Sequence, residues 1–270
     1  MGGSVSGWSE VELSIKEAGI KPPVIILGMH RSGTSCLTGS LQQAGLALGD
    51  VHTANPFNKK GNREHPDLMA LHESLLESNG GSWHQPPKDV VWSASYIKKR
   101  DQFSEQFAGA GDWGFKDPRA LLALDGWLAR FPDARLVGTI RHPLSVARSL
   151  HRRDPSLHTL EEYMQVWAEY NRRLLAAWRM RPFPVVDFDQ PDPVYMASLQ
   201  RVLPALGLRE GLVSLVRRFG LVKGLRLALG GESEPFFDPD LRTHRLESLD
   251  GLPAEIAELY LELKQMASAW

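Results

Sequence analysis

The chain has 270 residues, of which 43% are hydrophobic and 23% are charged. These values are typical of a globular protein and exclude a disordered or fibrous chain. The formal net charge is -1, so the overall charge does not favour nucleic acid, and we expect no nucleic-acid partner. The single cysteine, Cys36, allows no internal disulfide, which predicts a reducing, cytoplasmic location.

We expect residues 1–270 to form one domain, because a single α/β domain often reaches this length, and we expect residues 1–8 to be flexible. Ser9 and Glu12 form a capping-box pattern that predicts a short helix ending near Gly19. No apolar run reaches the roughly 18 residues that a membrane-spanning helix needs, so no spanning helix is predicted.

The first buried strand is predicted at "VIILG", Val24–Gly28. A short, continuous, β-branched run suits a central parallel strand that is covered on both faces. A loop and then a helix from about Gly33 to Gly45 are predicted next. Further strands are predicted within "WGFKDPR", "ARLVGTI" and "PVVDFD", and further helices at residues 67–78, 120–131 and 160–179 and after Pro143.

Alternating strands and helices predict a three-layer α/β fold, with a central parallel sheet flanked by helices and a helical C-terminal part. Ligands of such sheets bind at the carboxyl ends of the strands. Three polar turns are predicted at that edge, namely 28–35, 116–119 and 141–149. A long polar loop over residues 50–66 is a further candidate, because loops of this length are often functional.

The loop "GMHRSGTS" carries the chemistry of an anion site. A tight turn and the start of a helix both point backbone N–H groups at one place. Arg31 adds a planar cation that suits oxyanions, and Ser32, Thr34 and Ser35 add hydroxyl groups. The alternative is a strand, turn and helix that are simply rich in small residues.

A nucleoside-triphosphate loop would read G-x-x-x-x-G-K-[ST], but Thr34 occupies the lysine position here. A kinase also needs an aspartate at another strand end to hold Mg²⁺. No apolar strand is expected to end in such a residue, and Asp117, the nearest candidate, follows a lysine. A P-loop nucleotide-dependent kinase is therefore the alternative interpretation. No Cys/His cluster has zinc-ligand spacing, so no metal site is predicted.

Four segments together resemble the sulfotransferases that use 3′-phosphoadenosine-5′-phosphosulfate (PAPS), in their bacterial and tyrosylprotein-type branch. "GMHRSGTS" resembles the 5′-phosphosulfate loop, and "RHPLSVARS" resembles the 3′-phosphate motif, in which an arginine is followed eight residues on by a serine. "GFKDPR" and "NKKGNRE" resemble segments of the bacterial members. The resemblance spans Val24 to Ser149 and implies a P-loop-like fold.

The resemblance implies an enzyme that moves a sulfuryl group to a hydroxyl or amine acceptor without a metal. It implies that PAPS, and its product adenosine 3′,5′-bisphosphate (PAP), are bound by His30, Arg31, Ser32, Gly33, Thr34, Ser35, Arg141 and Ser149.

Three residues are implied as catalytic. Arg31 is placed against the leaving group, and Lys116 is placed near the bridging oxygen. The alternative for Lys116 is an ion pair with Asp117 or another carboxylate. Glu64 is implied as the base, and the alternatives are His65, His52 and His84.

The chain departs from the small-molecule sulfotransferases at two places. Cys36 stands where those enzymes carry a tryptophan against the adenine. Their C-terminal Arg-Lys-Gly signature is absent, and Arg242 and Arg245 are candidates to replace it, with a solvated turn as the alternative. A non-catalytic sulfotransferase-like protein that binds a nucleotide therefore stays open.

The resemblance does not specify the class of acceptor, which can be a small molecule, a glycan, a lipid or a peptide. Residues 211–230 mix leucine and valine with four basic residues. Such a segment predicts either a helix packed on the core or a peripheral membrane contact.

Overall fold

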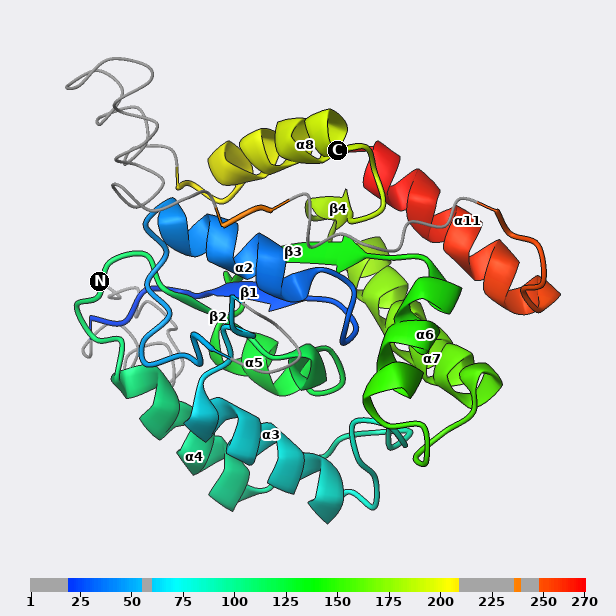
Figure 1. Cartoon of the computed structure of the whole chain (residues 1–270). Helices are drawn as coiled ribbons and strands as arrows, with labels where there is room; N and C mark the ends of the chain where they lie inside the picture. Colours follow the sequence, from blue (N-terminus) through cyan, green and yellow to red (C-terminus); the bar gives the residue numbers. More distant parts are fainter. Residues whose placement is uncertain (1–18, 55–59, 209–235, 239–247) are drawn as a thin grey trace, which may run out of the picture.

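The structure is a computed structural model that describes residues 19–54, 60–208, 236–238 and 248–270. Its centre is a four-stranded sheet in the order β2-β1-β3-β4, and all neighbouring strands are parallel. The strands are β1 (Val24–Leu27), β2 (Gly114–Lys116), β3 (Arg135–Ile140) and β4 (Val185–Asp187). The predicted α/β class with a central parallel sheet is confirmed (Figure 1).

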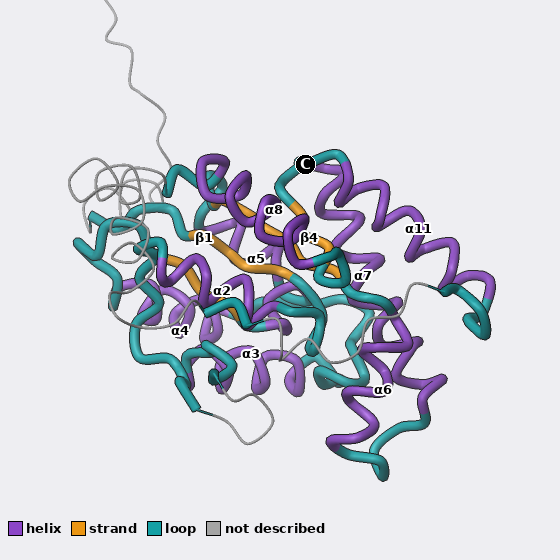
Figure 2. Tube along the Cα trace, turned by 45° about the horizontal axis from the view of Figure 1, so that its top comes forward, coloured by secondary structure: helices purple, strands orange, loops and turns teal. Residues whose placement is uncertain are grey.

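Helices cover both faces of the sheet (Figures 1 and 2). Successive strand residues point to opposite faces. Val24 and Ile26 therefore pack against α2 (Thr34–Gln43) and α8 (Asp192–Ala205). The opposite face of the sheet packs against the remaining helices, which are α3 (Pro66–Ser78), α4 (Ala94–Glu105), α5 (Leu124–Arg130), α6 (Pro143–Arg153), α7 (Leu160–Met180) and α11 (Ala254–Ser268).

Several predicted helix boundaries are confirmed. Helix α2 begins directly after Gly33 and ends before Gly45, whose φ of 100° is the left-handed conformation that favours glycine at a helix end. Pro143 is the first residue of α6, where its missing N–H costs nothing. Helix α7 begins at a capping box formed by Thr159 and Glu162.

Two features of the fold differ from the predictions. The helix expected at residues 120–131 is split into a 3₁₀ turn, η1 (Pro118–Leu121), and helix α5. The Asp117 carboxylate accepts the Arg119 N–H at 3.0 Å and starts a tight turn before the predicted helix, and such turns rarely run beyond four residues. Helix α4 was not predicted, because it buries few side chains and its apolar stripe is weak.

Some predictions fall on residues outside the described ranges. They are the short helix before Gly19, the segment 211–230, and Arg242 with Arg245. No helix in the described ranges has both the length and the apolar character to cross a bilayer. The single-domain organisation over 1–270 stays a prediction.

Candidate active site

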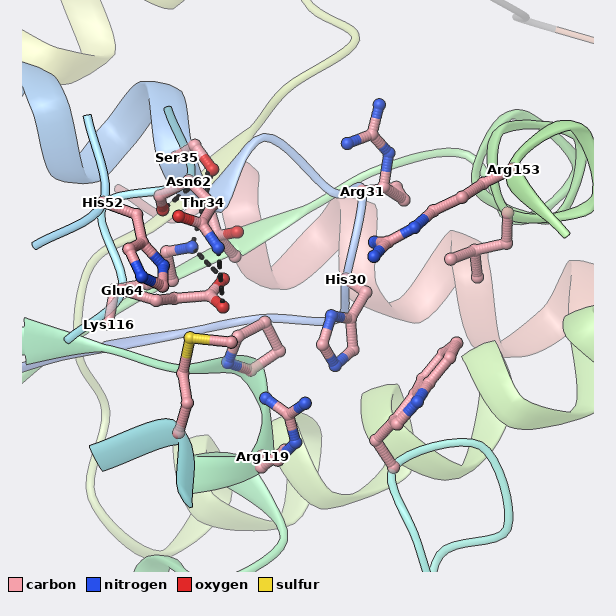
Figure 3. Close-up of a pocket in the computed structure, with 14 residues that line it drawn as sticks. His30, Arg31, Thr34, Ser35, His52, Asn62, Glu64, Lys116, Arg119 and Arg153 are labelled. Carbon is pink, nitrogen blue, oxygen red and sulfur yellow. Dashed lines mark hydrogen bonds and ion pairs between the residues drawn. The ribbon is translucent and has the colours of Figure 1, made fainter. Parts of the chain in front are cut away.

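The loops that follow β1 and β2 meet the start of α2 and helix α6 around one cavity of about 220 Å³ (Figure 3). Four cationic side chains are among the residues that line it, and Glu64 is the one carboxylate in that lining. The cations are Arg31, Lys116, Arg119 and Arg153. The excess of positive charge indicates a site for anions.

The loop after β1 has a backbone that only particular residues allow. A Cβ on Gly28 would lie 2.7 Å from the Thr139 carbonyl oxygen, so β3 approaches the loop too closely for a side chain there. Gly33 has φ of 85°, and a Cβ there would overlap the Phe188 ring. Arg31 is left-handed with φ of 66°, a conformation that is costly for a residue with a side chain and concentrates at functional sites.

The loop presents unused polar groups to its concave side. The first turn of α2 contains no acidic residue, and its N-cap residue is Gly33, which has no side chain to cap the helix. Its first N–H groups are therefore available to an anion. The Ser32 hydroxyl is buried and has no hydrogen-bond partner within the described part of the chain. The residues present thus fit a phosphate-like or sulfate-like group.

The structure brings the loop and the motif after β3 into direct contact. The Arg31 Nε donates to the Ser149 hydroxyl at 2.9 Å, and the Arg141 Nη1 donates to the Arg31 carbonyl at 3.1 Å. Arg141 lies over the Phe188 ring and 3.5 Å from an oxygen of Asp189. Burial, and then repulsion by nearby arginines of which Arg141 has the largest effect, lower the pKa of Arg31. An anion bound here would relieve that repulsion.

Glu64 and Lys116 form a buried ion pair. The Lys116 Nζ donates to the Glu64 carboxylate at 2.5 Å, and the two residues are 1% and 6% exposed, in that order. The Asn62 amide also donates to Glu64 at 3.1 Å, and the Ser35 hydroxyl donates to the Asn62 carbonyl at 3.1 Å. The alternative foreseen for Lys116, an ion pair, is therefore present. Its partner is Glu64, the residue implied as the base, and not Asp117.

The three histidines considered as alternative bases lie in different places. His52 lines the cavity with Glu64. His65 caps α3, where its Nδ1 accepts the Asp67 N–H at 3.3 Å. The His84 Nδ1 is 3.0 Å from the His158 Nε2, and His84 is not among the lining residues. Glu64 and His52 are thus the two candidate bases that the structure brings to the cavity.

Arg119 and Arg153 also line the cavity, and the sequence motifs assign no role to either. Arg119 lies in the quoted segment "GFKDPR", and Arg153 is four residues beyond Ser149 on α6. Residues four apart on a helix share a face, so the position of Arg153 was available from the motif. Trp83 also lines the cavity.

His30 lies between Arg31 and Arg119 in the cavity (Figure 3). Its ring centroid is 4.8 Å from that of Trp83, and its Nε2 is buried without a hydrogen-bond partner in the described part of the chain. Burial, and then the positive charge of Arg119, hold the pKa of His30 well below its ordinary value. His30 is therefore a neutral imidazole that can either donate or accept a hydrogen bond.

One expectation about strand ends is wrong, since β4 is apolar and its last residue is Asp187. That carboxylate is already engaged. It accepts from the Lys264 Nζ at 2.6 Å and from the Asp189 N–H at 2.9 Å, and Asp187 does not line the cavity. Its position does not favour a Mg²⁺ site beside the loop.

The fold is a P-loop-like α/β fold, and a cavity whose charged side chains are mainly cationic lies at the carboxyl ends of its strands. The sequence matches a family described as "Sulfotransferase family" over residues 22–209. The chain therefore belongs to the sulfotransferase family. A comparison with curated proteins found no match.

The solved structures that match this chain include three sulfotransferases. The sulfotransferase domain of the Synechococcus PCC 7002 olefin synthase has a TM-score of 0.54 at 17% identity, covering 91% of this chain and 95% of that one. The sulfotransferase STF1 from Mycobacterium tuberculosis H37Rv has a TM-score of 0.44 at 17% identity, covering 72% and 70%. The sulfotransferase STF9 from Mycobacterium avium has a TM-score of 0.45 at 15% identity, covering 82% and 79%. At these identities, the likeness to the first structure shows the fold alone.

Proposed function

We propose that this chain is an enzyme that transfers a sulfuryl group from PAPS to a hydroxyl or amine acceptor, by in-line displacement and without a metal ion. The observation that carries this proposal is the contact of Arg31 with Ser149 and Arg141. It brings the two motifs that resemble phosphate-binding segments side by side. The Lys116–Glu64 pair opens into the adjoining cavity.

The donor would supply a sulfuryl group attached to a 5′-phosphate that is a good leaving group. The N–H groups at the start of α2, together with the hydroxyls of Ser32, Thr34 and Ser35, would hold the 5′ end. Arg141 and Ser149 would hold the 3′-phosphate. Charge-assisted hydrogen bonds from arginine to phosphate are among the strongest that proteins make, so two separate arginines suit two separate anionic groups.

Glu64 would accept the proton of the acceptor hydroxyl as its oxygen forms a bond to sulfur and the bond from sulfur to the phosphate oxygen breaks. Lys116 and Arg31 would then stabilise the negative charge on the departing phosphate. The ion pair suits this exchange, because a proton on Glu64 frees the Lys116 ammonium for the leaving oxygen. His52 is the alternative base.

Calorimetry with PAP in the presence of a chelator tests the donor site. We expect metal-free binding of PAP that is stronger than binding of ATP with Mg²⁺. Ser149→Ala should weaken PAP at least tenfold, because it removes a hydroxyl from the 3′-phosphate site and the partner of Arg31. Ser104→Ala is the matched control, since Ser104 is a buried helix serine on α4, and PAP affinity should be unchanged in that variant.

A preference for ATP with Mg²⁺ would indicate the kinase alternative and overturn the proposal. To separate an enzyme from a non-catalytic binder, PAPS turnover is measured with a panel of small-molecule, glycan, lipid and peptide acceptors. Glu64→Gln should lose turnover by about 10²–10⁴-fold while keeping PAP bound. Turnover that survives in Glu64→Gln would move the base role to His52.

A further inference from the structure

Arg119 occupies the side of the cavity opposite the donor loop. Figure 3 shows its guanidinium pointing into the cavity toward His30, with Arg31 on the far side of that histidine. Arg119 is only 6% exposed. Since Arg31, Arg141 and Ser149 already form the site proposed for the donor, Arg119 is a cation at a separate position.

One edge of this guanidinium is fixed by a buried chain of hydrogen bonds. The Arg119 Nη1 donates to the Asp117 carboxylate at 3.0 Å, and the His72 Nδ1 lies 3.0 Å from the other Asp117 oxygen. The Trp127 Nε1 donates to the His72 Nε2 at 2.9 Å. An indole is only a donor, so His72 carries its proton on Nδ1 and donates it to Asp117.

This chain keeps Asp117 ionised. Burial alone would raise the pKa of Asp117, but the charge of Arg119 and the His72 hydrogen bond outweigh it and hold the pKa below its ordinary range. Arg119 is therefore held by a permanent anion at its Nη1. Its orientation is set before any ligand arrives, which is the requirement for specific recognition.

The other edge of Arg119 is left for a ligand. Within the described part of the chain, the Arg119 Nε is buried with no hydrogen-bond partner, and Nη2 approaches only the half-exposed Glu73 at 4.0 Å. A guanidinium has five N–H donors in a planar fork that matches a carboxylate. The neutral His30, whose Nε2 is also buried without a partner, faces the same space.

We propose that Arg119, assisted by His30, binds a carboxylate on the acceptor, so that the enzyme acts on hydroxy acids or amino acids and not on neutral alcohols. The lining that Arg119 shares with the Lys116–Glu64 pair also includes Met69 and Pro118. These apolar side chains suit the carbon skeleton that links a carboxylate to the reacting hydroxyl. This inference rests on the proposed function, because it assigns the acceptor side of the same site.

The test uses the full chain saturated with PAP. Binding of acetate and of 3-hydroxybutyrate is measured by calorimetry against their amides, acetamide and 3-hydroxybutyramide. We expect the carboxylates to bind at least tenfold more tightly than the amides. Arg119→Lys keeps the charge opposite Asp117 but loses the fork, and should reduce this preference at least fivefold. Arg130→Lys is the matched control, because Arg130 is equally buried but lies outside the cavity.

A second variant, Asp117→Asn with Arg119→Gln, removes the buried pair as a unit and serves if Arg119→Lys folds poorly. It should abolish the preference for carboxylates. Equal affinity for acids and amides, or a preference that survives in both variants, would overturn the proposal. Inorganic sulfate is titrated in parallel. If Arg119→Lys weakens sulfate and not the carboxylates, Arg119 serves the transferred group and the inference is wrong. The titrations are repeated without PAP, so a failure of PAP binding counts against the donor assignment alone.

Discussion

The two ends of the cavity are built by different means. At the end formed by β1 and β3, the anion-binding groups come from two contiguous stretches, residues 28–35 and 141–149. Much of that end is backbone, because the first N–H groups of α2 lie at a helix start, where they have no intrahelical partner. At the end formed by β2, the groups are side chains from separate elements. Lys116 pairs with Glu64 across 52 residues of chain, and Asp117 pairs with His72 across 45.

The two ends of the cavity differ in how the protein stabilises buried charge. Backbone dipoles at a helix start are fixed by the helix itself and need no counter-ion. Buried side-chain charges need a partner, and removing one partner leaves the other uncompensated. We therefore expect the β2 end to be the more fragile of the two, and the β1–β3 end to keep its ligand when the β2 end is changed.

The largest effect is expected at the Lys116–Glu64 pair. Lys116→Met should lower the free energy of unfolding by about 3–5 kcal/mol, because it leaves the Glu64 carboxylate buried and unpaired. Glu64→Gln should also destabilise, and the double variant should recover to within about 1 kcal/mol of the wild type. Urea denaturation of the four proteins measures this cycle.

PAP affinity serves as the readout for the other end. It should change less than about threefold in Lys116→Met if the two ends are independent, because Lys116 stays paired with Glu64 until that carboxylate takes up the proton of the acceptor. In the denaturation cycle, losses of unfolding free energy in the two single variants that simply add in the double variant would show that the pair is not coupled. A large loss of PAP affinity in Lys116→Met would show that the two ends form one unit.

The β1–β3 end was open to prediction because its signals are local. A β-branched run, two glycines and a helix start follow one another within "VIILGMHRSGTS", and each predicts its own backbone conformation. The same holds for Arg141 and Ser149, which a strand end and one helix place together. The parallel sheet followed from the alternation of strands and helices for the same reason.

The pairings at the β2 end could not be read in this way. Glu64, Lys116, Asp117 and Arg119 were all visible as residues, but nothing local decides which carboxylate meets which cation. The sequence alone suggests Asp117, the neighbour of Lys116 in the chain, as a partner in an ion pair. The two point to different partners because successive residues at a strand end face opposite sides. The split of residues 118–130 into η1 and α5 has a related cause, since Asp117 starts the tight turn.

Gly33 allows the backbone of the β1–β3 end to be broken selectively. Gly33→Ala should destabilise the fold by about 2–4 kcal/mol, from the left-handed backbone together with overpacking against Phe188. It should also weaken PAP strongly. Gly45→Ala is the control, because Gly45 has φ of 100° but nothing within 4 Å of its Cβ position. Its loss should stay near 1–2 kcal/mol, with PAP affinity unchanged. Equal losses of stability by thermal or urea denaturation would show that the Phe188 contact is unimportant.

The smallest effect concerns the loop that carries Trp83. Burial, and then the nearby His158, hold the pKa of His84 below its ordinary value. Its folded pKa is thus below the value of about 6.5 in the unfolded chain. The unfolded chain then binds more protons between those two values, so the contribution to stability is present above about pH 6.5 and is lost as the pH falls through the folded pKa.

An NMR titration of the His84 ring should show this depressed pKa directly, and His158→Asn should move it toward the ordinary value. It should not return fully, because burial is the larger cause. Between pH 7 and pH 5, His84→Gln should lose less stability than the wild type. PAP affinity at pH 7 should be the same in both variants, since neither His84 nor His158 is among the residues that line the cavity. A change in PAP affinity would show that this histidine pair influences the donor end of the cavity. It would contradict the independence of the two ends.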